Sequence, residues 1–185
     1  VFLRSMRIFV EEEYVGAVPG GVGCTKNAGN YGAAMYATAE AKRKGFDQVL
    51  WMDAFEHKYV QECGTMNVFF IIGNKAITPG LEDGTILAGV TRDSVIQIIK
   101  EIGLEVEERK LSIDEIVDAY KGGTLREVFG TGTAATISKI KELCYRDLTM
   151  KFDTDNWKIS AEIISRMNAI KANKAEDKYG WMVKV

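Results

Sequence analysis

Glycine divides this sequence into short segments. Eighteen of the 185 residues are glycine and only two are proline, and the glycines gather in a few places. Because glycine adopts backbone conformations that other residues avoid, such clusters predict loops where the backbone can come close to a ligand. We therefore expect the chemistry of this protein at its glycine-rich loops.

The apolar pattern between the loops predicts both strands and helices. We expect helices at residues 31–44, with Asn30 as N-cap and Gly45 as the terminating glycine, and at residues 91–102, 112–120 and 156–173. We expect strands at residues 6–10, 47–53, 59–62, 66–72, 75–78, 104–110 and 125–129. Because no repeat, low-complexity tract or linker interrupts this order, residues 1–185 are predicted to form a single domain of the α/β (mixed α+β) class.

Charge and cysteine content exclude several function classes. The 24 Lys and Arg residues balance 26 Asp and Glu residues without a basic block, which argues against nucleic-acid binding. No run of 18 apolar residues predicts a membrane span. The three cysteines, Cys24, Cys63 and Cys144, show no metal-ligand spacing, so we expect packing thiols in a cytoplasmic protein and no metal site. The single histidine, His57, is predicted to be a turn residue rather than a catalytic one.

Three polar motifs lie beside glycines. Lys26, in TKNAGNYG, precedes a predicted helix, and Glu62, in ECGTMN, ends a predicted strand. The third motif is a pair of segments, LAGVTR and GTGTAA, that offer the free backbone N–H groups and hydroxyls that a phosphate needs. Each alone also fits a solvated lysine, a turn residue or a helix cap. Together they suit pyridoxal phosphate, which takes a lysine amine, a carboxylate at its ring nitrogen and a phosphate site.

Four segments resemble a known family in the same order and at similar spacings. They are EYVGAVPGGVGCTKNAGNYG, QVLWMDAFEHKYVQECGTMNVFF, DGTILAGVTRDSVIQI and REVFGTGTAATIS, and the closing EDKYGWMVKV is also similar. The family is that of the branched-chain amino-acid aminotransferases, pyridoxal phosphate enzymes of fold type IV, and the similarity is to their large C-terminal domain. The resemblance implies a short-stranded β pseudo-barrel flanked by helices. It also implies a homodimer that transfers the amino group of leucine, isoleucine or valine to 2-oxoglutarate.

The resemblance further implies roles for individual residues. Lys26 would bind pyridoxal 5′-phosphate covalently and shuttle the proton between the substrate Cα and the C4′ carbon of the cofactor, while Glu62 would keep the pyridine nitrogen protonated. Tyr31 would hydrogen-bond the phenolic oxygen of the cofactor and also contact the substrate. The remaining ring and phosphate contacts are expected at Leu87, Val90, Thr91 and Thr133. The remaining substrate contacts are expected at Thr65, Ala134 and Ala135.

The sequence also departs from the family. Members carry a smaller N-terminal domain that contributes to the cofactor and substrate sites, and it is absent here, so we expect the chain to be inactive alone. Mammalian relatives carry a redox-active CxxC motif where Ala135 and Ser138 stand, so that switch is not expected. Lys139 stands where a proline is common, which predicts a local change only.

Three alternatives stay open. The chain could belong to another fold-type-IV enzyme, either a D-amino-acid aminotransferase or an aminodeoxychorismate lyase. It could be a dinucleotide-binding module, because the segment from Gly130 to Ala135 matches GxGxxA after a strand, with Asp153 about 20 residues further on. It could also be a folded fragment that takes up no cofactor.

Overall fold

A computed structural model describes residues 5–134 and 136–183. Within these residues, nine strands form one sheet in the order β3-β2-β1-β8-β7-β4-β5-β6, with β9 paired to β8. The strands are β1 (Met6–Val10), β2 (Gln48–Met52), β3 (Val60–Cys63), β4 (Asn67–Ile72), β5 (Lys75–Thr78), β6 (Glu105–Glu108), β7 (Leu125–Gly132), β8 (Thr136–Tyr145) and β9 (Leu148–Lys151). The helices are α1 (Ala28–Arg43), α2 (Val90–Glu101), α3 (Ile113–Lys121), the 3-10 turn η1 (Thr154–Asn156) and α4 (Ile159–Lys171).

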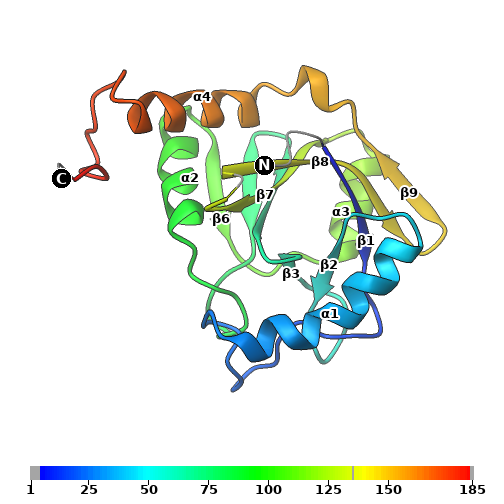
Figure 1. Cartoon of the computed structure of the whole chain (residues 1–185). Coiled ribbons are helices and arrows are strands. Elements are labelled where there is room, and N and C mark those ends of the chain that lie inside the picture. The colour runs from blue at the N-terminus through cyan, green and yellow to red at the C-terminus, as the bar shows by residue number, and fades with distance from the viewer. Residues whose placement is uncertain (1–4, 135, 184–185) are drawn as a thin grey trace.

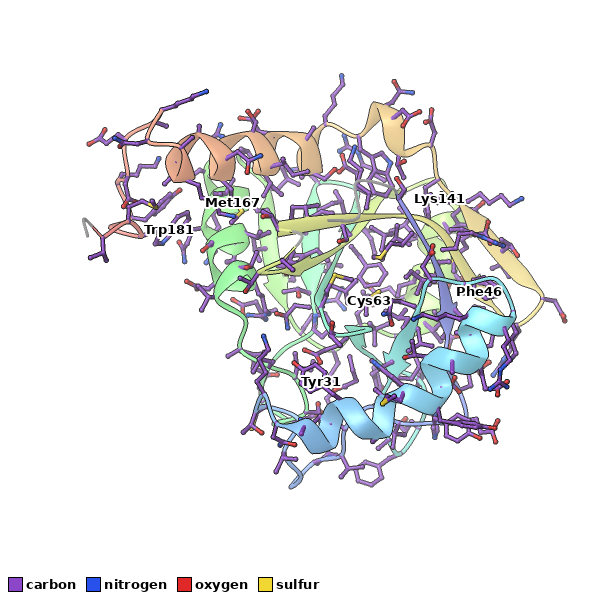
Figure 2. All side chains as sticks on the ribbon, viewed as in Figure 1. Tyr31, Phe46, Cys63, Lys141, Met167 and Trp181 are labelled. Atoms are coloured by element: carbon purple, nitrogen blue, oxygen red, sulfur yellow. The ribbon has the colours of Figure 1, made fainter. Side chains whose placement is uncertain are left out.

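Strand β4 shows how the curled sheet separates two cores. Successive side chains of a strand point to opposite faces. Val68 and Phe70 therefore join the cluster inside the curl, while Phe69 and Ile71 join the cluster that also contains apolar residues of α2 and α4. Figure 2 shows side chains filling the space inside the curl, with Cys63 near its middle. The continuous apolar sequence of β4 follows from its burial on both faces.

Helices α1, α2 and α4 lie outside the curled sheet, whereas α3 contributes Ile113, Ile116 and Ala119 to the cluster inside the curl. Figure 1 shows α2 and α4 together on one side of the molecule and α1 on the opposite side, across β2. The buried residues of α1 are Ala37 and Ala41, which pack with Val49 and Trp51. Because α1 contributes small side chains to this contact, it can lie close to the strand. This arrangement confirms the expected mixed α and β class, with a pseudo-barrel flanked by helices.

Helix α1 begins earlier than its sequence predicts. Its N-cap is Asn27 rather than Asn30, and Oδ1 of Asn27 accepts the backbone N–H groups of the second and third helical residues. The side chain of Asn30 turns back toward the preceding loop, where Nδ2 donates to the carbonyl oxygens of Val22 at 2.8 Å and Thr25 at 2.9 Å. Both asparagines are suitable caps, so the hydrogen bonds of the loop decide between them.

The segment after β7 differs most from the prediction. Strand β7 continues to Gly132, and Thr136 begins the antiparallel strand β8, in which Ser138 pairs with Gly130. The GxGxxA segment therefore joins two strands, whereas a dinucleotide site requires it to lead from a strand into a helix. The dinucleotide-binding alternative is wrong for this reason. The sequence predicts a polar connection where the structure has strands β8 and β9.

The remaining expectations concern cysteines, the histidine and membranes. Cys63 is buried and Cys144 half-buried, as packing thiols should be, but Cys24 is exposed, so the packing prediction for Cys24 is wrong. His57 lies in a turn with a φ of 48°. None of the helices among the described residues has the length and apolar character to cross a membrane.

Candidate active site

A tight hairpin turn places Glu62 beside Asn67. Cys63 and Met66 exchange two backbone hydrogen bonds of 2.9 Å each, which leaves a two-residue turn between β3 and β4. The first turn residue is Gly64, whose φ of 59° suits the turns that join antiparallel strands. Glu62 and Asn67 are the next residues out from this pair, and Nδ2 of Asn67 donates to Oε1 of Glu62 at 3.3 Å.

The carboxyl group of Glu62 is largely removed from water. Burial raises the pKa of Glu62 to about 7, although a hydrogen bond of 3.2 Å from the backbone N–H of Leu87 favours the charged form. Within residues 5–134 and 136–183, no lysine, arginine or histidine forms an ion pair with it. A buried carboxyl without a cationic partner can take one from a ligand. Its neighbour Cys63 stays protonated, because burial raises the pKa of that thiol to about 12.

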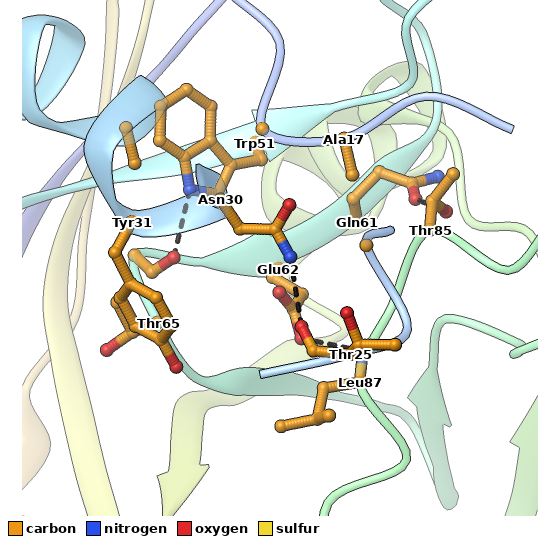
Figure 3. A pocket seen from close by; sticks show the side chains of 14 residues that line it. Ala17, Thr25, Asn30, Tyr31, Trp51, Gln61, Glu62, Thr65, Thr85 and Leu87 are labelled. Carbon is orange, nitrogen blue, oxygen red and sulfur yellow. Dashed lines mark hydrogen bonds between the residues drawn. The ribbon is translucent and has the colours of Figure 1, made fainter. Parts of the chain in front are cut away.

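Four of the predicted site residues line one pocket. Tyr31, Glu62, Thr65 and Leu87 surround it (Figure 3), and it holds about 600 Å³ of space including its open mouth. These residues come from α1, β3, the hairpin turn and the segment before α2. The structure therefore unites residues that are up to 56 positions apart in the sequence.

Lys26 lies on the loop before α1, next to the pocket rather than in its lining. The neighbouring Thr25 lines the pocket, and its backbone N–H donates to the carbonyl oxygen of Val22 at 2.9 Å. The side chain of Lys26 is exposed, and in the part of the chain that the structure describes its amine forms neither a hydrogen bond nor an ion pair. The loop is thus fixed by hydrogen bonds while the amine remains available.

The start of α2 follows directly on the pocket. Leu87 lines the pocket, and Val90 and Thr91 are the first two helical residues. The N-cap, Gly89, provides no side-chain hydrogen bond. Because the first N–H groups of a helix lack an intrahelical acceptor, this helix end can bind an anion such as a phosphate. Neither Val90 nor Thr91 lines the pocket itself.

The turn between β7 and β8 lies at the same end of the sheet. Thr131 pairs with Asn67 across β7 and β4, so the chain beyond Thr131 continues past the start of β4. Thr133 and Ala134 are exposed in this turn and do not line the pocket. Ala135 lies outside the described residues. Thr133 and Ala134 are therefore neighbours of the pocket rather than part of its wall, whereas Thr65, the other described residue predicted to bind the carboxylate, lines it.

Comparison with known proteins decides the family. The sequence profile described as amino-transferase class IV matches residues 18–143. The chain belongs to this class IV aminotransferase family. It is 49% identical over 184 residues to a probable branched-chain-amino-acid aminotransferase of Staphylococcus epidermidis, covering 99% of this chain and 51% of that protein. This class IV aminotransferase chain thus spans about half the length of the curated relatives it matches.

Solved structures agree with this assignment. The branched-chain aminotransferase of Thermoproteus uzoniensis, solved with norvaline, matches with a TM-score of 0.82 at 26% identity, over 99% of this chain and 57% of that one. The Thermobaculum terrenum enzyme in its pyridoxal phosphate form matches with a TM-score of 0.81 at 26% identity, over 97% of this chain and 55% of that one. The class IV aminotransferase fold accounts for the curled sheet and its helices.

Some pocket residues of this class IV aminotransferase were not predicted. Trp51 was expected in the core and is indeed only 3% exposed, but its ring also lines the pocket, and Nε1 donates to the carbonyl oxygen of Gly64 at 2.9 Å. Asn30, Gln61 and Thr85 also line the pocket. Asn30 lies next to Tyr31 in the sequence, and its proximity to a predicted residue is the one signal that could have found it.

Proposed function

We propose that this chain is the cofactor-binding domain of a branched-chain aminotransferase. The reaction is transfer of the amino group of leucine, isoleucine or valine to 2-oxoglutarate with pyridoxal 5′-phosphate. Support comes from the branched-chain aminotransferases that the chain resembles over 97% to 99% of its length. Because those proteins are about twice as long, we propose that residues 1–185 act with a smaller N-terminal domain, as a homodimer in the cytoplasm.

The residues present fit this cofactor, and the buried carboxyl of Glu62 is the observation that carries the proposal. A carboxyl whose pKa burial raises to about 7 is costly to ionise without a positive partner. The protonated ring nitrogen of pyridoxal phosphate is such a partner. The available amine of Lys26 and the uncapped start of α2 match the aldehyde and the phosphate of the same molecule.

Each side chain has a part in the proposed reaction. When bound, pyridoxal phosphate withdraws electrons from the bonds at the substrate Cα. Lys26 would hold the cofactor aldehyde through Nζ, and the same amine would move the proton between the substrate Cα and C4′ of the cofactor. Glu62 holds the proton at the ring nitrogen, which strengthens the electron withdrawal. Tyr31 would donate to the phenolic oxygen, and Leu87 would pack on the face of the ring.

Backbone groups and hydroxyls orient the two anionic ends. The N–H groups of Val90 and Thr91, together with the hydroxyl of Thr133, bind the phosphate at the start of α2. Thr65 and Ala134 receive the substrate carboxylate, with Tyr31 beside them. Ala135 is assigned to the same carboxylate from the resemblance alone.

Spectroscopic titration with pyridoxal phosphate tests the proposal. The parent chain should develop the visible absorbance band of a lysine condensed with the cofactor aldehyde, and Lys26→Ala should not. Lys26→Arg is the matched control, since it keeps the positive charge but cannot condense with an aldehyde. A band that survives in both variants contradicts the assignment of Lys26. Absence of a band in a folded parent chain contradicts cofactor binding by this domain alone.

Substrate class is tested after the N-terminal half is restored. We expect amino transfer from L-leucine, L-isoleucine and L-valine to 2-oxoglutarate, and none from D-alanine. Lys26→Ala should lower kcat by several powers of ten, each of which corresponds to about 1.4 kcal/mol of activation free energy. Preference for D-alanine would favour the D-amino-acid aminotransferase alternative instead.

A further inference from the structure

The amide of Asn67 contacts three parts of the candidate site. Asn67 is 5% exposed, and its Nδ2 donates both to Oε1 of Glu62 at 3.3 Å and to the carbonyl oxygen of Leu87 at 2.8 Å. Its Oδ1 faces Gly89, where an added Cβ would lie only 2.2 Å from that oxygen. One side chain therefore joins the buried carboxyl, the pocket wall and the residue that precedes α2.

These contacts form a closed set. The backbone N–H of Leu87 donates to the same oxygen of Glu62 that Asn67 contacts, while the carbonyl of Leu87 accepts from Asn67. The carboxyl of Glu62 thus accepts from two residues, Leu87 and Asn67, that are also hydrogen-bonded to each other. Since Nδ2 has two oxygen acceptors, a rotated amide would place Oδ1 against both of them. An unprotonated aspartate at position 67 would also place an oxygen against both acceptors, Oε1 of Glu62 and the carbonyl oxygen of Leu87. The site therefore requires an amide.

We propose that Asn67 is a positioning residue that aims the Glu62 carboxyl at the ring nitrogen of the cofactor and couples it to the phosphate end of the site at α2. The coupling runs through Leu87 and Gly89, which connect the pocket wall to the first turn of α2. This inference rests on the proposed function. A donor to the carboxylate also favours its charged form, against the burial that disfavours it.

The first test needs no cofactor. Carboxyl-carbon NMR of the cofactor-free chain, with the Glu62 signal assigned from Glu62→Gln, gives the pKa of Glu62 in each variant. Asn67→Leu removes the donor and Asn67→Asp replaces it with an acid, at nearly constant size. Both should raise the pKa of Glu62 by about one or more. If Asn67→Leu fails to fold, Asn67→Ser carries the test, because its hydroxyl cannot span both acceptors.

Thr131→Val is the matched control. Thr131 lies opposite Asn67 across β4 and β7, is 1% exposed, and its hydroxyl has no hydrogen-bond partner among the residues that the structure covers. Its replacement disturbs the same packing without removing a donor to Glu62. The pKa of Glu62 should not change in this variant. An equal shift in Thr131→Val and Asn67→Leu would overturn the inference, because it would reflect packing alone.

The second test separates this inference from the proposed function. In titrations with pyridoxal phosphate, Asn67→Leu should weaken binding by about tenfold or more, whereas Lys26→Ala abolishes the visible band. The role of Asn67 alone is overturned if the chain binds the cofactor through Lys26 but the Asn67 variants keep both the parent pKa of Glu62 and the parent affinity for pyridoxal phosphate. A Glu62 pKa that responds to Asn67, in a chain that does not bind the cofactor even when the N-terminal half is added, overturns the proposed function instead.

Discussion

Gly23 lies against Thr85 so closely that a Cβ at position 23 would be 2.5 Å from the Thr85 carbonyl oxygen. The same Cβ would be 2.6 Å from Cβ of Ala17, and the next residue, Cys24, donates its backbone N–H to the carbonyl of Gly84 at 3.1 Å. The loop that carries Lys26 therefore packs backbone to backbone on the segment that leads to the pocket wall.

This contact predicts that Gly23→Ala displaces the loop. The variant should lose about 1–3 kcal/mol of unfolding free energy, the usual cost of overpacking, and should bind pyridoxal phosphate more weakly. Gly32→Ala is the control, because apart from its chain neighbours and the backbone of α1 itself no described atom lies within 4 Å of the added Cβ. It should gain up to about 1 kcal/mol from helix propensity. Urea denaturation of both variants measures the difference, and effects of the same sign would contradict the packing argument.

Asn30 is expected to order the loop more than it stabilises the whole domain. Asn30→Ala removes the two hydrogen bonds to the carbonyls of Val22 and Thr25, at a cost of about 1 kcal/mol in this partly exposed site. The amide of Thr25, bonded to Val22, should lose hydrogen-exchange protection. Asn27→Ala, which removes the N-cap, should instead increase exchange at the first turn of α1. Unchanged exchange at Thr25 would show that Asn30 does not hold the loop.

The raised pKa of Glu62 has a consequence for stability. Its pKa is about 7 in the folded chain against an ordinary value of 4.5, so the folded state binds more protons between these pH values. The contribution of Glu62 to the unfolding free energy is therefore greatest below pH 4.5. It decreases by up to about 3 kcal/mol as the pH rises to about 7. Glu62→Gln removes this dependence, because a glutamine does not ionise.

Denaturation of the cofactor-free chain at pH 5 and pH 8 tests this prediction. Glu62→Gln should be more stable than the parent at pH 8, and the gain should shrink at pH 5. Glu82→Gln, which replaces an exposed acid, is the control and should show no comparable pH-dependent difference in stability from the parent. A Glu62→Gln variant that is less stable than the parent at pH 8 would mean that the carboxyl is already compensated in the folded chain.

Local sequence rules predicted most elements but missed strands β8 and β9, and the reason can be identified for β8. Strand β8 contains apolar residues at Ile137, Ile140 and Leu143, a spacing that does not alternate. The register between β1 and β8 shifts between Met6 and Arg7, so one extra residue of β8 lies in a bulge. Ile137 also joins the cluster with α2 and α4, whereas Ile140 and Leu143 join the cluster inside the curl. Burial on both faces and the bulge together hide the two-residue period of β8 in the sequence.

The candidate site could be predicted by residue type but not by shape. The spacing of ECGTMN predicts a turn with Glu62 at its edge, and the hairpin confirms this. Trp51 could not be assigned to the pocket, because its apolar strand resembles any buried strand. Its place depends on Gly16, where an added Cβ would lie 3.0 Å from the indole ring. Contacts between segments this far apart in the chain follow from the topology of the sheet, which local patterns do not encode.

A buried acid fixes the last helix. Glu127 of β7 is 4% exposed, and its two carboxylate oxygens accept the backbone N–H groups of Ile159 and Ser160, each at 2.8 Å. The N-cap of α4, Lys158, provides no side-chain hydrogen bond. An acid from a strand thus replaces the usual cap and also interacts favourably with the helix dipole.

Loss of this acid should be costly. Glu127→Ala leaves two buried N–H groups without an acceptor and should lower the unfolding free energy by about 3 kcal/mol. Glu127→Gln should cost less, since its one carbonyl oxygen can still accept. Glu162→Gln, which replaces an exposed acid in the first turn of α4, is the control and should stay within about 0.5 kcal/mol of the parent. Chemical denaturation compares the three variants, and a Glu127→Ala loss no larger than that of Glu162→Gln would show that α4 docks without this contact.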